Sequence, residues 1–448
     1  MAENLENLTG ELLDAARRAG ADAADALAVS ARSVSIEVLH GKLEHAERAE
    51  GIDIGLRVLI GQRQACVSSS DTRRETIDEM ARRVVAMARE APDDDAIGLA
   101  NPSQFAEKRD AEGLELFDPA PEPDPATLER QALKAEAAAL AVKGVKQVQG
   151  ASAGYSSRHL HLATSNGFSG GYGRTGISTS CVAISGEGLS MERDYASESR
   201  TFQADLPDAA EIGQLAGERA VERHGPNRPP TGAFPVLFDE RIASSLISHL
   251  LAAINGASIV RGSSWLGDGL GKQVLPKGMS LTEDPLRRRI SGSRPFDGEG
   301  LPVQSRELVS DGILNGWTLD LATARRLGMQ STANAMRGTS SPPSPAAGNV
   351  ALTPSTRNRA ALIADMGEGL LVTSLIGASI NPTTGDYSRG ASGFWVKNGE
   401  ITGPVNQCTI AGNLRQMLLS LVAANDAKPH HSRMVPSLLV EGLTIAGG

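Results

Sequence analysis

The segment GPNRPPTG (225–232) constrains the fold of this chain most, because its prolines and glycines interrupt both helices and strand ladders. At about 150 residues per domain, a chain of 448 residues is expected to form two to four domains. We predict an α+β fold, with an α+β part before this segment and a strand-rich domain with a few helices after it. The predicted divisions are an N-terminal block (1–91), a linker (92–125), a second block (126–226) and a C-terminal domain (233–448).

The N-terminal part is predicted to contain two similar blocks, each with several strands followed by a helix. Helices are predicted at 4–19, 71–90, 126–142 and 208–223, and the first block has strand-like segments at 33–40, 51–60 and 62–69. Setting Gly51 against Gly176 also aligns Gly61 with Gly186. This match indicates an internal duplication, and the alternative is two meanders of similar composition.

The remaining segments differ in character. Residues 92–125 hold six prolines and the acidic run Asp93–Asp95, which is typical of a linker or an extended surface strap. In the C-terminal part, apolar runs and turn signals predict a strand at 235–238, a helix at 240–255, hairpin turns at 311–312 and 398–399, a strand at 370–380 and a helix at 413–426. Gly256 is expected to end the first of these helices.

Composition excludes several classes of protein. The chain has 44 Lys and Arg against 53 Asp and Glu, and this net charge of −9 leaves no broad basic surface for nucleic acid. Cys66, Cys181 and Cys408 lie far apart, which argues against a disulfide framework and a thiolate zinc cluster. No signal peptide and no run of about 18 apolar residues is present. We therefore expect a cytoplasmic protein with no nucleic-acid or membrane partner.

Two short motifs match catalytic or binding patterns, and each has a simpler alternative. GFSGG (167–171) resembles a nucleophile elbow around Ser169, but it lies between two strand-like segments and is predicted to be a hairpin loop. GDGLGK (267–272) hints at a phosphate loop, but Gln273 replaces the required Ser or Thr. Neither motif is therefore taken as the site.

None of the eight histidines forms a zinc motif by itself. His159 and His161 would share one strand face without a third ligand near in sequence. His430 and His431 are predicted to lie in a solvated loop. His249 lies at the edge of the apolar stripe of its predicted helix, where a buried, hydrogen-bonded histidine is the alternative to a functional one.

The segment TTGDYSRGASGFW (383–395) is the other candidate site, because it joins two strand-like segments and surrounds polar side chains with glycine. Its candidate contact residues are Asp386, Tyr387, Ser388, Arg389 and Gly390. Glycine permits close approach of a ligand backbone, and the charged side chains could bind peptide groups. The alternative is a structural turn with an internal Asp–Arg ion pair.

Several segments of the C-terminal part carry a resemblance to a known family. They are HLLAAINGASIVRGSSWLGDGLGKQVLP (249–276), PFDGEG (295–300), DGILNGW (311–317), TGDYSRGASGFWVKNGEITGPV (384–405) and TIAGNL (409–414). In order and spacing they closely resemble the PmbA (TldE) proteins of the TldD/PmbA metallopeptidase family, also called modulators of DNA gyrase. The N-terminal half resembles the same family more loosely.

The resemblance implies where a zinc centre would lie. TldD-type members carry HExxxH on a helix and a Cys ligand near the C-terminus. In this chain the first His of the motif falls on His249, the Glu on Leu250 and the second His on Ile254, while 433–442 contains no Cys. Zinc catalysis needs three protein ligands and an open position for water. We therefore expect no catalytic residue, metal site or cofactor in this chain, and zinc in a TldD-type partner.

The resemblance also implies a function. It makes the chain a PmbA/TldE-type subunit of a cytoplasmic metalloprotease complex that acts on unfolded or flexible peptides, in peptide maturation and antitoxin degradation. The subunit would be active only with its TldD-type paralogue, and His249 and the Asp386–Gly390 segment would contact substrate or partner. Whether the chain forms a homodimer without that partner is left open. The alternative is a regulatory protein that binds gyrase or a toxin–antitoxin pair without any peptidase role.

Overall fold

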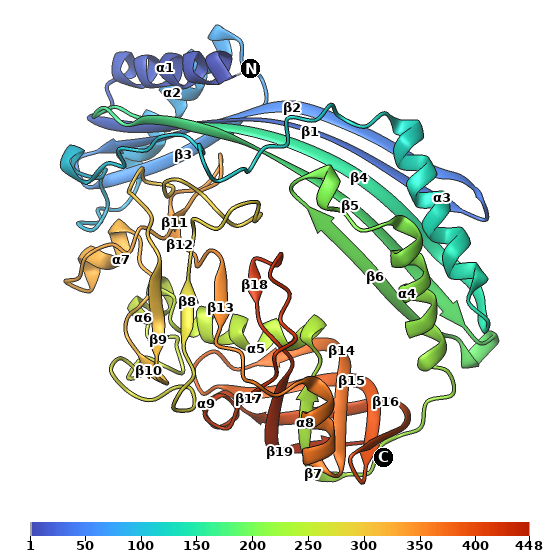
Figure 1. The fold of residues 1–448 in the computed structure, drawn as a ribbon. Coiled ribbons are helices and arrows are strands. Elements are labelled where there is room, and N and C mark those ends of the chain that lie inside the picture. Colours follow the sequence, from blue (N-terminus) through green and yellow to red (C-terminus); the bar gives the residue numbers. More distant parts are fainter. Residues whose placement is uncertain (1, 448) are drawn as a thin grey trace.

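The computed structural model describes residues 2–447, and their N-terminal half forms one long antiparallel sheet of six strands (Figure 1). Its order is β3-β2-β1-β4-β5-β6, with bounds Ala23–Leu39 (β1), Lys42–Ile60 (β2), Arg63–Ser69 (β3), Val145–Thr164 (β4), Ser169–Ser185 (β5) and Glu192–Arg200 (β6). Four helices cover one face: Ala2–Ala19 (α1), Arg74–Glu90 (α2), Pro125–Ala141 (α3) and Ala209–Glu222 (α4). On β1, Ala26 packs with α1 and α2, and Ile36 on the same face packs with α3 and α4.

The two halves of this sheet repeat one arrangement of a helix, three strands and a helix. The elements α1-β1-β2-β3-α2 are followed by α3-β4-β5-β6-α4, and β1 pairs with β4 at the centre of the sheet. Gly51 lies opposite Ala31 of β1, and Gly176 lies opposite Ser156 of β4. The matched order and positions favour an internal duplication over two unrelated meanders.

The helices form where their apolar spacing predicts them, because each buries one face on the sheet. Leu5 and Leu12 of α1 and Ile77 and Val84 of α2 are almost completely buried in one cluster. The first strand is longer than the predicted 33–40, since β1 already begins at Ala23. Its first residues are buried on both faces, which removes the alternation by which strands are recognised.

The proline-rich segment between α2 and α3 is a strap that joins the two parts of the molecule. Arg325 donates a hydrogen bond to the carbonyl of Ala96 at 2.9 Å, and the amide of Ala106 donates to the carbonyl of Gly300 at 2.9 Å. The ring of Phe105 packs on Phe168, with centroids 5.4 Å apart. Of the two predicted forms, a linker or an extended surface strap, the segment is the strap, and it is anchored on the C-terminal part.

The C-terminal part is built around a second six-stranded sheet, of order β16-β15-β14-β7-β19-β17. Its bounds are Gly232–Phe238 (β7), Gly369–Ile380 (β14), Asp386–Lys397 (β15), Glu400–Asn413 (β16), Val422–Ala423 (β17) and Leu438–Ala446 (β19). β16 also pairs with β19, so the sheet closes on itself. The helix α5 (Glu240–Ala253) packs on one face and α8 (Arg359–Met366) on the other.

Shorter elements complete this part, which lies across the sheet from α1 and α2 (Figure 1). They are α6 (Gly256–Val260), β8 (Leu281–Glu283), β9 (Arg306–Ser310), β10 (Ile313–Leu314), α7 (Leu321–Arg326), β11 (Ala335–Met336), β12 (Ser344–Pro345), β13 (Val350–Leu352), α9 (Leu414–Leu419) and β18 (Arg433–Met434). The α+β class and the strand-rich C-terminal part are as predicted. Within residues 2–447, no helix combines the length and apolarity needed to cross a membrane.

Local predictions in the C-terminal part are partly confirmed. Asp311 and Asn398 each have a positive φ and a following glycine with positive φ, as both predicted hairpin turns require. The helix predicted at 413–426 is wrong in length, because α9 ends at Leu419 and the chain then pairs as β17 with β19. Gly256 does not end a helix but begins α6, where Asn255 caps the helix by accepting a hydrogen bond from the amide of Ala257.

Buried charges join the two parts of the molecule under the strap. Asp25 of β1 accepts hydrogen bonds from Arg57 at 2.5 Å and forms an ion pair with Arg337 of the C-terminal part. Glu299, in the PFDGEG segment, accepts from the amide of Leu321 at 2.9 Å. Burial, and then the neighbouring charge of Asp297, raise the pKa of Glu299 above its ordinary 4.5.

This raised pKa makes stability depend on pH in a defined direction. Above the ordinary carboxyl value, Glu299 loses its proton in the unfolded chain but keeps it in the folded chain, so the free energy of unfolding falls as pH rises. We expect Glu299→Gln to reduce this slope, with buried Asp297, whose pKa is also raised, supplying the rest, and to stabilise the protein at pH 8 by about 1–2 kcal/mol relative to the wild type. Urea denaturation at pH 5 and pH 8 measures this. Glu107→Gln, at an exposed position, is the control. If the free energy of unfolding of Glu299→Gln changes with pH as much as that of this control, the prediction is wrong.

Candidate functional site

Three of the predicted site residues meet between α5 and β15. His249 projects from α5. Tyr387 and Arg389, two residues apart on β15, point to the same face of that strand. The rings of His249 and Tyr387 pack edge to face, with centroids 5.9 Å apart and an interplanar angle of 75°. The sequence-predicted residues His249, Tyr387 and Arg389 are therefore brought together.

The other polar candidates of that segment point elsewhere. Asp386 binds the Thr384 hydroxyl at 2.6 Å and the Asn413 side-chain amide at 3.2 Å, on the exposed side of β15. Ser388 lies on the same face as Asp386. Arg389 donates to the carbonyl of Gly377 at 2.6 Å, so the Asp–Arg pair considered for a structural turn does not form.

The surroundings keep the site uncharged except for Arg389. Burial lowers the pKa of His249, and the nearby Arg389 guanidinium lowers it further. Burial raises the pKa of Tyr387 to about 12, although Arg389 offsets part of the rise. His249 is therefore neutral and Tyr387 protonated at pH 7. The Nε2 atom of His249 is buried and has no hydrogen-bond partner among the described residues.

The residues around His249 do not fit a zinc ion. Leu250 and Ile254, at the Glu and second His positions of the family motif, are both 0% exposed in the largest hydrophobic core. The thiol of Cys408 donates to the carbonyl of Ala391 at 3.2 Å, and its pKa is raised to about 11 by burial. The cation of Arg389 beside His249 would also repel a divalent ion. These residues therefore do not supply a metal centre at this position.

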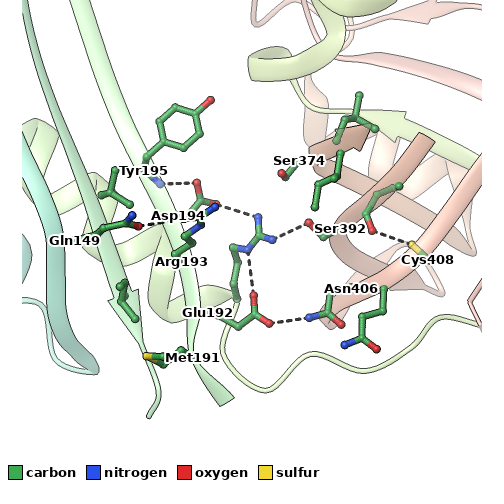
Figure 2. A pocket seen from close by; sticks show the side chains of 18 of the residues that line it. Gln149, Met191, Glu192, Arg193, Asp194, Tyr195, Ser374, Ser392, Asn406 and Cys408 are labelled. Atoms are coloured by element: carbon green, nitrogen blue, oxygen red, sulfur yellow. Dashed lines mark hydrogen bonds and ion pairs between the residues drawn. The ribbon is translucent and has the colours of Figure 1, made fainter. Parts of the chain in front are cut away.

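A cleft of about 970 Å³ opens beside this site, between β6 and the strands β14, β15 and β16 (Figure 2). Gly390, the last of the predicted contact residues, lines it together with the residues that follow on β15. Met191, Tyr195 and Ile376 also line it and are 48%, 51% and 70% exposed, which is high for large apolar side chains. β6 is the end strand of its sheet, so one edge of it is not paired with another strand. At Tyr195 the backbone amide donates to the Asp194 carboxylate and the carbonyl accepts from Arg219.

Polar side chains cross the cleft at its base (Figure 2). Arg223 donates to the Ser392 hydroxyl at 2.7 Å and lies 3.5 Å from Asp194. The side-chain amide of Asn406 donates to Glu192 at 2.7 Å. These contacts fix the edge of the N-terminal sheet to β15 and β16. The sequence did not predict these contacts. The only local signal for them is the charged run ERD at 192–194.

The GFSGG and GDGLGK segments have structural roles. Ser169 begins β5 directly after a turn from β4, which confirms the hairpin. Its hydroxyl lies 3.2 Å from Nε2 of His161, whose Nδ1 lies 2.8 Å from the Thr9 hydroxyl, so this chain of contacts attaches α1 to the sheet. In the GDGLGK segment, Asp268 pairs with Lys272 and with Arg415 of α9.

Comparison with known families places this fold in a class of metallopeptidase-like proteins. Models described as PmbA/TldA metallopeptidase domain 1, central domain and C-terminal domain match residues 24–88, 118–223 and 231–447. The chain belongs to the PmbA/TldD metallopeptidase family, as its segments predicted.

Individual proteins agree with this assignment. A protein named metalloprotease PmbA homolog from Haemophilus influenzae is 37% identical over 99% of this chain and 96% of its own length. Metalloprotease PmbA from Escherichia coli O157:H7 is 33% identical over 95% of this chain and 92% of its own length. A crystal structure from Bacteroides thetaiotaomicron, described as a modulator of DNA gyrase, covers all of both chains with a TM-score of 0.91 and 28% identity. TldE from Thermococcus kodakarensis shares the fold, with a TM-score of 0.84 at 21% identity over 98% of this chain and all of its own.

Proposed function

We propose that this chain is the PmbA/TldE-type subunit of a cytoplasmic TldD/TldE-like metalloprotease complex that cleaves unfolded or flexible peptides. One observation carries the proposal: Leu250 and Ile254 occupy metal-motif positions as fully buried core residues. Packed leucine and isoleucine can neither bind zinc nor move a proton. The chain then serves the complex through its surfaces, and the zinc belongs to the TldD-type partner.

The cleft beside β6 is the surface that suits a flexible peptide. An extended peptide can pair with the backbone of an end strand whatever its side chains are, which fits substrates without a fixed sequence. The exposed apolar side chains of Met191, Tyr195 and Ile376 would contact such a peptide or the partner subunit. Arg389 lies outside the cleft lining, beside His249 on the α5-facing side of β15, where it supplies a cation for a peptide carboxylate or carbonyl.

Co-purification tests the assembly. Co-expressed with the TldD-type paralogue of its own organism, the chain is expected to form a stable pair across an interface above about 1,000 Å². After washing with a weak chelator, the pair should contain one zinc, and His249→Ala in this chain should leave that content unchanged. Failure to co-purify would support the alternative of a regulatory protein. Loss of zinc in the His249→Ala pair would overturn the assignment of the metal to the partner.

A further inference from the structure

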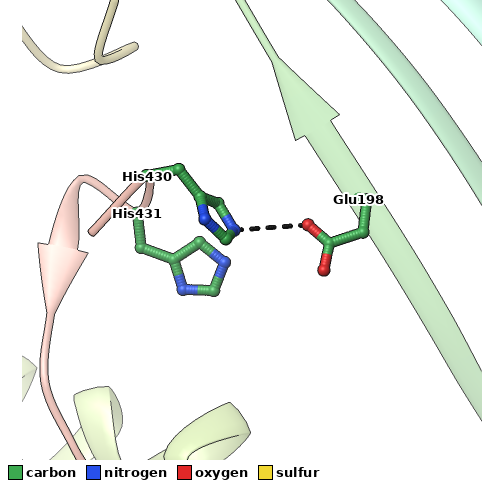
Figure 3. A group of neighbouring side chains, drawn as sticks. All are labelled: Glu198, His430 and His431. Carbon is green, nitrogen blue, oxygen red and sulfur yellow. Dashed lines mark ion pairs between the residues drawn. The ribbon is translucent and has the colours of Figure 1, made fainter. Parts of the chain in front are cut away.

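A second group of metal-binding side chains lies away from α5, at the contact between the two parts of the molecule. Glu198 projects from β6, and His430 and His431 lie in the turn before β18 (Figure 3). One ligand atom from each residue lies within 4.8 Å of the other two. Within residues 2–447 this is the only such group of three. The prediction of a solvated loop holds for His431, which is exposed, but is wrong for His430, which is half-buried against the sheet edge.

One ring nitrogen of His430 has no hydrogen-bond partner among the described residues. Nε2 of His430 lies 3.3 Å from Oε2 of Glu198 but is buried without a hydrogen bond. The two rings pack edge to face with centroids 4.5 Å apart.

The neighbouring charges balance one another. Arg200 donates to Oε2 of Glu198 at 2.8 Å, which leaves Oε1 with only the longer, 4.0 Å approach of Lys428. Lys428 itself pairs with Glu240 at 2.8 Å, and the second carboxylate oxygen of Glu240 is buried without a hydrogen bond. Two carboxylates thus offset two cations around the imidazoles. A bound cation would compete with Arg200 and Lys428, which limits its affinity.

Space for a further ligand is present. A cavity of about 280 Å³ is bordered by Glu198, Glu240, Lys428 and His431. This volume can hold water molecules on an open coordination position. The side chain of His431 is exposed and can turn to shorten its distance to the other two ligands.

We propose that Glu198, His430 and His431 form a binding site for a borderline divalent transition-metal ion such as Zn²⁺ or Co²⁺. Two imidazoles and one carboxylate are a ligand set that such ions accept, with water in the fourth position. The expectation of a chain without metal was drawn from the family zinc motif, at α5 and in 433–442, and this site uses other residues. A bound ion would connect β6, which lines the cleft, to the C-terminal part, independently of the proposed peptidase role.

Cobalt titration of the full chain tests the site, because tetrahedral Co²⁺ absorbs visible light. We expect one equivalent of Co²⁺ to bind with micromolar affinity and to be displaced by Zn²⁺. His431→Ala should weaken binding at least tenfold, and the double variant His430→Gln/His431→Gln should abolish it. The matched control is His45→Gln, which changes an exposed histidine lying 3.9 Å from Glu47 without a third ligand.

Each result decides the proposal. Unfolding midpoints measured in the presence of a chelator show whether each variant is folded. If the double variant does not fold, the single variant His431→Ala, at an exposed position, provides the test of binding. The wild type should also gain thermal stability with added Zn²⁺, since the ion binds only the folded chain. No saturable Co²⁺ binding, or equal binding by the wild type and the His431→Ala variant, would overturn the site.

Discussion

The isolated chain is expected to leave flexible peptides uncut, whereas its pair with the TldD-type paralogue cleaves them. The reason is that the α5 positions for the metal ligands and the general base hold Leu250 and Ile254, buried in the core. A fluorogenic peptide without stable structure, incubated with the chain, the partner or the pair, measures this. Cleavage by the chain alone in the presence of a chelator would refute both the partner requirement and the metallopeptidase assignment.

Within the pair, Arg389→Ala is expected to lower kcat/KM about tenfold or more, as loss of a charged hydrogen-bond donor to substrate or partner would. Arg389 also holds β14 to β15 through the carbonyl of Gly377, so the unfolding midpoint of the variant must be measured beside its activity. Ser169→Ala is the control, because that hydroxyl lies under α1 and should leave the rate unchanged. A variant pair with full activity would remove Arg389 from the site.

Sequence patterns predicted the elements whose burial is one-sided. α1 and α2 have apolar faces at helical spacing, and both Asp-Gly and Asn-Gly turns form the predicted hairpins. The beginning of β1 was missed because Ala24–Val29 is buried on both faces and shows no period of two. α9 was predicted too long because the apolar run continues past its end, into β17. Local spacing cannot distinguish a buried helix from the short strand that follows it.

The part of the candidate site that the sequence predicted is the part that lies within one segment of the chain. Tyr387 and Arg389 share a strand, and their alternation already places them on one face. Their contact with His249 depends on how α5 packs on the sheet, which a single sequence does not encode locally. The contact of Arg223 with Ser392 in the cleft and the contact of Glu198 with His430 also depend on how distant segments pack. Each of these pairs joins segments from the two different parts of the molecule.

Asp25→Ala is expected to cost about 3–5 kcal/mol, which is among the largest losses for a single substitution in this chain. Asp25 is 3% exposed and is the carboxylate that both Arg57 and Arg337 contact. Burial lowers the pKa of Arg337 to about 9, but the group remains charged at pH 7. Removing Asp25 therefore leaves two buried cations without their common partner.

Comparison with two other variants separates this effect from a general loss of charge. Arg337→Met should cost less, because the Asp25–Arg57 pair remains and methionine fills part of the volume. Asp14→Ala, in the exposed pair of Asp14 with Arg17, should change the unfolding free energy by less than about 1 kcal/mol. Chemical denaturation at pH 7 gives all three values. Because Arg337 belongs to the C-terminal part and Asp25 to the N-terminal sheet, the Asp25 variant should also separate the two parts before either unfolds. A single transition at the wild-type midpoint would show instead that the strap and the Arg223 contacts suffice to hold the molecule together.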